Sequence, residues 1–144
     1  MMRNRAASVA VLIVGMLLVS SSLDAQQATR PDSLSLARQY TGWFYTAQFD
    51  SLVAHHSAED RADPNLRGSL ERALAQLTSR AGTELEVIDE KFVMRSKQRQ
   101  YWRTARFNGY DEPILLRWVL SAEGEIIGIG MGPASQAPPI DSAS

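Results

Sequence analysis

The residues best suited to chemistry lie in one short polar segment near the middle of the chain. His55 and His56 are followed by Glu59, Asp60 and Asp63, and imidazole and carboxylate groups are common metal ligands. His55 and Glu59 stand four residues apart and can share one helix face, whereas adjacent histidines point in different directions. This spacing favours a solvated helix end over a metal site, so we expect neither a metal nor another cofactor.

A second set of residues could supply acid–base catalysis. Asp89 and Glu90 lie at an irregular point of a predicted strand, and Tyr40 and Tyr101 could reach a cavity in which burial would tune their pKa values. No acid–base motif fixes the positions of these four groups. We therefore predict that both tyrosines lie at the edge of the core, and we assign no catalytic residue.

Two arginines interrupt strand segments that are otherwise apolar. Arg103 and Arg117 could face a cavity and bind a carboxylate or phosphate through their guanidinium groups. Alternatively, they lie on the outward sheet face, paired with Glu86, Glu90 or a partner subunit, which is the ordinary arrangement for charged strand residues. Nearby tryptophans belong either to the core or to an apolar dimer surface. The candidate ligand-cavity residues are Tyr40, Tyr101, Arg103, Arg117 and Trp118.

The composition of the chain excludes several classes of function. Its 15 basic and 16 acidic residues give a formal net charge of -1, so there is no broad positive field to hold nucleic acid. The absence of cysteine removes disulfides, thiolate nucleophiles and zinc–cysteine sites. The chain also lacks the Gly-x-Ser-x-Gly, His-Glu-x-x-His and phosphate-loop motifs. Common hydrolases and nucleotidases would need one of these parts.

The N-terminus has the layout of a secretory signal peptide. Arg3 and Arg5 precede an apolar run over residues 6–19, and Leu23-x-Ala25 suits cleavage after Ala25. The run is shorter than the ~20 residues needed to span a bilayer, although an uncleaved membrane anchor or a buried helix is the alternative. We expect a periplasmic or secreted protein with no membrane span after cleavage.

The remaining chain divides into a polar lead-in over residues 26–32, a folded domain over 33–132, and a tail over 133–144 expected to lack fixed structure. Three helices are predicted first. Asp32 or Ser33 caps the first helix, Asp50 is available to cap a short second one that ends near His56, and Asp63 caps a third that ends at Gly82. The apolar stripe of the third helix consists of Leu66, Leu70, Leu74 and Leu77.

From Thr83 onward the apolar residues alternate, which predicts about four antiparallel strands. A change of phase indicates a bulge near Ile88 and Asp89. The last two strands, over 114–120 and 125–131, form a hairpin with a three-residue loop at 122–124. Its predicted pairs are Leu120 with Ile126, Trp118 with Gly128, and Leu116 with Gly130. The predicted fold class is α+β, with three N-terminal helices on one face of the sheet.

Three sequence features resemble one known family. They are Gln48-Phe49-Asp50-Ser51-Leu52, the helix end Ala81-Gly82, and a final hairpin with Gly124, Ile126, Gly128, Ile129 and Pro133. Over residues 34–133 the chain looks like an uncharacterised extracytoplasmic branch of the nuclear-transport-factor-2-like superfamily, a cystatin-like fold. The resemblance implies a curved sheet wrapped around helices as a cone, with a cavity at its open end and a sheet back that often pairs two subunits.

These observations lead to two hypotheses from different classes. The first is an exported, non-catalytic domain that binds a small ligand or another exported protein and forms a homodimer through its sheet. The alternative is a small cavity enzyme of the ketosteroid-isomerase or cyclase type that uses a carboxylate and a tyrosine. Because this fold hosts both enzymes and binding modules, a buried carboxylate beside a tyrosine is the feature that would favour the enzyme.

Overall fold

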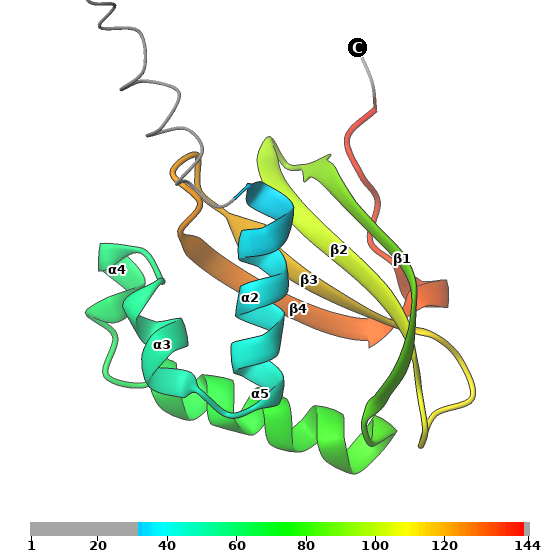
Figure 1. The fold of residues 1–144 in the computed structure, drawn as a ribbon. Coiled ribbons are helices and arrows are strands. Elements are labelled where there is room, and N and C mark those ends of the chain that lie inside the picture. The colour runs from blue at the N-terminus through cyan, green and yellow to red at the C-terminus, as the bar shows by residue number, and fades with distance from the viewer. Residues whose placement is uncertain (1–31, 143–144) are drawn as a thin grey trace, which may run out of the picture. The chain divides into compact units, whose positions relative to one another are not determined.

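The computed structural model describes residues 32–142, where four α-helices precede a four-stranded antiparallel sheet (Figure 1). This confirms the α+β class and the order of helices before strands. The expected signal peptide, and all of the lead-in except Asp32, lie outside the described residues. The elements are α2 (Ser33–Tyr45), α3 (Phe49–Ala54), α4 (Ala58–Arg61), α5 (Leu66–Ala81), β1 (Glu84–Arg95), β2 (Gln98–Phe107), β3 (Ile114–Leu120), β4 (Ile126–Pro133) and the 3-10 turn η1 (Ala134–Gln136).

The helix starts differ in how closely they follow the predicted caps. Asp32 caps α2, because its side chain accepts a hydrogen bond from the backbone N–H of Ser35 at 2.6 Å. The predicted cap of α3 is wrong: Gln48 is the N-cap, and Asp50 lies inside the first turn, where it pairs with Arg67 of α5.

The segment before α5 also departs from expectation. A fourth helix, α4, forms because the Ser57 hydroxyl accepts from the N–H of Asp60 at 3.3 Å. Asp63 does not cap α5, since its carboxylate and carbonyl instead accept from Asn65 and Leu66 in a turn, and the helix begins at Leu66. The predicted end of α5 at Gly82 is confirmed.

The sheet has the order β1-β2-β3-β4, which makes β1 and β4 its two edges. The predicted bulge is present, because the β1–β2 register shifts between Val87 and Asp89. In the hairpin, Leu120 pairs with Ile126 as predicted, but Trp118 pairs with Ile129 and Leu116 with Met131. The two other predicted pairs are wrong because a register shift beside Leu120 leaves Ile127 as an extra residue.

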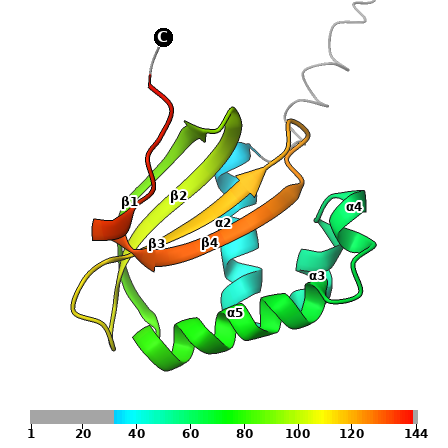
Figure 2. The same cartoon turned by 180° about the vertical axis from the view of Figure 1, so that it is seen from behind.

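Helix α2 lies across one face of the sheet, and α5 runs along the side of the sheet next to β4 (Figures 1 and 2). Trp118, Tyr101, Tyr40 and Phe44 are almost fully buried between this inner face and the helices. The Trp118 indole N–H donates to the Thr41 hydroxyl at 3.0 Å, so the polar atom of this large side chain is satisfied inside the core.

The chain after β4 is ordered over its described part, unlike the tail predicted for residues 133–144. Pro133 still belongs to β4, residues 134–136 form η1, and the following segment returns beside β1 (Figure 2). The Asp141 carboxylate accepts from the backbone N–H groups of Ser96 and Lys97 at 2.9 Å each, and the Asp141 N–H donates to the Met94 carbonyl. These hydrogen bonds attach the C-terminal segment to the β1–β2 turn.

Candidate functional site

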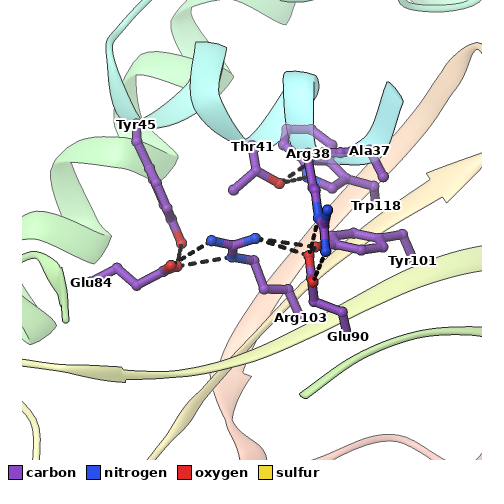
Figure 3. Close-up of polar contacts among 9 residues, drawn as sticks. All are labelled: Ala37, Arg38, Thr41, Tyr45, Glu84, Glu90, Tyr101, Arg103 and Trp118. Carbon is purple, nitrogen blue, oxygen red and sulfur yellow. Dashed lines mark hydrogen bonds and ion pairs between the residues drawn. The ribbon is translucent and has the colours of Figure 1, made fainter. Parts of the chain in front are cut away.

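A compact group of charged and phenolic side chains lies between α2 and the inner sheet face (Figure 3). The inner charge cluster, as we name it, contains Arg38, Tyr45, Glu84, Glu90, Tyr101 and Arg103. The side chains of Glu84, Glu90 and Arg103 are only 13%, 15% and 15% exposed. Charged groups removed this far from water require close partners.

Arg103 occupies the centre of the inner charge cluster. Its guanidinium group donates to both Glu84 carboxylate oxygens, at 2.5 and 3.0 Å, and also to Glu90 at 3.1 Å. Arg38 forms a second fork on Glu90, at 2.7 and 3.0 Å. The Tyr101 and Tyr45 hydroxyls donate to Glu90 and Glu84 at 2.5 and 2.7 Å. Two carboxylates thus face two guanidinium groups, and the charges balance.

These contacts decide the protonation states of the cluster. Hydrogen bonds from Arg38, followed by that from Tyr101, lower the pKa of Glu90 to about 2 against the opposing effect of burial. Burial first, and the bond to Glu90 second, raise the pKa of Tyr101 to about 12. Burial and the bond to Glu84 also raise the pKa of Tyr45. Near neutral pH, Glu90 is therefore ionised and both phenols keep their protons.

The lowered pKa of Glu90 predicts an acid-sensitive contribution to stability. Because the folded pKa lies below the ordinary value of 4.5, this contribution is present above pH 4.5 and is lost as the pH falls toward 2. We expect the fall in the free energy of unfolding between pH 6 and pH 2 to be about 1 kcal/mol smaller in Glu90→Gln than in the wild type. The difference is small because solvent screens the half-exposed Arg38. Urea denaturation of both proteins between pH 2 and 6 measures it. Glu86→Gln, at an exposed pair with Arg106, is the control. Equal pH slopes for wild type and Glu90→Gln would contradict this role.

The structure places the five predicted cavity residues at separate locations. Tyr101 and Arg103 belong to the inner charge cluster, so Arg103 faces inward. Of its two expected carboxylate partners it binds Glu90, whereas Glu86 pairs with Arg106. Trp118 is fully buried in the core. Tyr40 donates to the carbonyl of Gly124 at 2.7 Å, which ties α2 to the β3–β4 loop.

Arg117 lies on the opposite sheet face from Arg103. The two residues point to different sides because Arg117 pairs with Trp102, the strand neighbour of Arg103. The Arg117 guanidinium lies over Gly130, in space that a larger side chain would fill. The five candidates therefore do not converge on one cavity.

The structure instead contains an open groove that the sequence did not reveal. Two pockets, of about 260 and 160 Å³, are lined by β4 and α5 and share Ile129. Figure 2 shows α5 running beside β4. We name them together the β4–α5 groove. Its walls are Leu66, Ser69, Leu70, Ala73, Gln76, Leu77, Arg80 and Ala81 of α5, residues 127–133 of β4, His56, Asp60, Tyr110 and Ile114.

The groove follows from the apolar patterns of its two walls. The predicted stripe of α5 supplies Leu66, Leu70 and Leu77, which recur at helical spacing. On β4, Ile129 and Met131 alternate with glycines, so their half-buried side chains share one face. An apolar floor is thus left partly open beside the edge of the sheet.

The edge of β4 is paired at one end only. Ile126 forms a parallel bridge with His56, in which the Ile126 N–H donates to the His55 carbonyl at 2.8 Å and the Ser57 N–H donates to the Ile126 carbonyl at 3.0 Å. Within residues 32–142, no backbone group from 127 to 133 bonds to a strand other than β3. The groove therefore borders a strand edge with free donors and acceptors.

Polar groups mark the two ends of the β4–α5 groove. At one end, the buried His56 is held by its Nδ1, which donates to the Leu52 carbonyl at 2.7 Å. Asp60 lies at the same end, and Arg80 with Gln76 at the other. His55 points elsewhere, with its ring 4.8 Å from that of Trp43. No three His, Asp or Glu side chains in the described part could hold a metal ion together.

Comparison with family models, curated proteins and solved structures finds no match for this chain. Among the helices of residues 32–142, none is both long and apolar enough to cross a membrane.

Proposed function

We propose that this protein is a non-catalytic binding domain whose ligand is an extended segment of another protein lying in the β4–α5 groove. The observation that carries the proposal is that the unpaired edge of β4 lies directly beside the apolar face of α5. Strand addition uses both parts, because backbone hydrogen bonds supply affinity and side-chain pockets supply specificity. Each pocket is smaller than the ~300 Å³ at the lower end for enclosed small-molecule sites, which favours a chain that spans both.

The enzyme hypothesis receives weaker support. Glu90 does lie beside Tyr101, as a ketosteroid-isomerase-type or cyclase-type site would require. However, Arg38 and Arg103 both bind this carboxylate, and its lowered pKa makes it a weak base. The Tyr101 hydroxyl donates its hydrogen bond to Glu90, so neither group is left to act on a substrate. The cluster is better explained as an ion-pair network that joins α2 to the sheet.

The fold family and the location of the protein belong to the same proposal. Helices that precede an antiparallel sheet and cover one of its faces support a nuclear-transport-factor-2-like cone. The basic, apolar and small-residue order over residues 1–25 supports export to the periplasm or beyond the cell. An exported domain of this kind would meet its protein ligand outside the cytoplasm.

We further propose that two copies associate through the β1 edge of the sheet. Leu85, Val87 and Ile88 of this edge are 64%, 37% and 49% exposed, an unusual apolar group for an edge strand. Sedimentation equilibrium should show a concentration-dependent dimer, and Ile88→Lys should make it monomeric. A wild-type protein that stays monomeric at every concentration would show that this association is absent.

Selection from a display library of random linear heptapeptides tests the binding function. Peptides enriched on the purified protein should lose at least about tenfold in affinity on Ile129→Lys, because the new charge lies in the apolar middle of the groove. The matched control is Ile140→Lys, the same exchange at an exposed position that lies outside both the groove and the β1 edge, and circular dichroism verifies that both variants are folded. No enrichment, or equal binding to both variants, would contradict the proposal.

A further inference from the structure

We infer that the β4–α5 groove receives its segment parallel to β4, with a basic N-terminal side near Asp60 and an acidic C-terminal side near Arg80. This inference rests on the proposed function and specifies the kind of partner. Two separate features of the groove carry it: the charges at its ends, and the direction of the chain that already pairs with β4.

The end charges of the groove are opposite in sign. Asp60 lines the pocket that contains Ile127, where the open edge of β4 begins, and Arg80 lines the pocket that reaches Pro133, where β4 ends. Within residues 32–142, neither side chain takes part in an ion pair, although seven ion pairs occur in that part of the chain. Both charges are therefore available to a ligand, and they favour one direction of binding.

The existing bridge on β4 favours the same direction. The segment His55–Ser57 runs parallel to β4 and exchanges two backbone hydrogen bonds with Ile126. The open edge begins at the next residue, so an incoming parallel strand would continue the hydrogen-bonding direction that the chain itself uses. Charge and backbone direction thus agree, although they depend on different residues.

The open edge also sets the length and pattern of the segment. Residues 127–133 at about 3.3 Å each span roughly 23 Å, which matches an extended ligand of about seven residues. Every second side chain of such a ligand would face the α5 wall, where Leu70, Ala73 and Leu77 lie. The ligand should therefore alternate apolar and polar residues between its charged ends.

Two synthetic probes of identical composition test this direction. The first is a capped heptapeptide that begins with lysine, ends with glutamate and alternates valine with serine between them, and the second has the reverse order. On the purified protein at low salt, we expect the lysine-first probe to bind about tenfold more tightly, because the reversed probe places like charges together at both ends. Raising the salt to about 0.5 M should reduce the difference to less than about threefold.

The matched variant exchanges both end charges, Asp60→Lys with Arg80→Glu, at positions outside the core. It should invert the preference and bind the glutamate-first probe more tightly. Equal binding of the two probes to wild type, or a preference that the exchange leaves unchanged, would overturn the inferred direction while the binding function stands. If neither probe binds while library-selected peptides do, the inference is wrong and the binding function stands. If neither the probes nor any library peptide binds, both fail. If the exchange instead changes the protein's mass in solution, a second copy occupies the groove, and the inference is wrong.

Discussion

Replacing Arg103 with alanine is expected to lower the free energy of unfolding by about 3–5 kcal/mol. The substitution leaves Glu84 without its guanidinium partner and Glu90 with only the fork from Arg38, while both carboxylates stay mostly buried. Urea denaturation at pH 7 measures the loss. The size of the effect reflects uncompensated buried charge, because intact buried ion pairs contribute little net stability.

The control for Arg103 lies on the same strand. Arg106→Ala removes an exposed arginine that pairs with Glu86 at 3.6 Å, and it should cost less than about 1 kcal/mol. A triple variant, Arg103→Met with Glu84→Gln and Glu90→Gln, should recover much of the loss by removing all three charges. A loss below about 1 kcal/mol for Arg103→Ala would show that the cluster is solvated and not the ion-pair network described above.

Trp118→Ala is expected to cost about 3–5 kcal/mol, since it removes a large, fully buried side chain. The indole packs edge-on against Phe44 and Tyr40, with ring centroids 5.9 and 6.1 Å apart. The truncation would therefore leave a cavity at the centre of the core. Thr41→Val should cost about 1–3 kcal/mol, because it leaves the buried indole N–H without its acceptor. Thermal and urea unfolding measure both changes.

A matched variant separates the structural role of Trp118 from a role in binding. Trp118→Phe keeps most of the apolar volume and should leave the affinity of groove-bound peptides unchanged, since Trp118 lines neither pocket of the groove. A selective loss of peptide affinity in a well-folded Trp118→Phe protein would show that Trp118 contributes to ligand binding.

Local patterns predicted most of the elements but not their pairing. The helix after Asp32, the leucine stripe of α5 and the bulge near Ile88 depend on residues close in sequence, and all three are present. The predicted register of the β3–β4 hairpin is wrong beyond Ile126, because Ile127 is an extra residue in β4. Next to that residue, Ile126 bonds to His55 and Ser57, which are about 70 residues away in the chain and outside any hairpin pattern.

The inner charge cluster and the groove depend on the same long-range information. The sequence predicts that Glu84 and Glu90 lie in a strand, but their contact with Arg103 depends on the β1–β2 register. The other arginine of the cluster, Arg38, comes from helix α2. The groove depends on β4 being an edge strand, which only the sheet order reveals. The leucine stripe of α5 was the available sequence signal, although it does not show that part of the stripe remains open.

Amide chemical shifts of the isotopically labelled protein, followed while the lysine-first probe is added, test the central claim most directly. If an extended segment adds to the open edge, the largest shifts will occur at residues 127–133 and along the α5 wall between Leu66 and Arg80. The N–H groups of the β4 edge should also become protected from hydrogen exchange. Saturable binding whose shifts are confined to the inner charge cluster or to β1, with an unchanged β4 edge, would contradict the account.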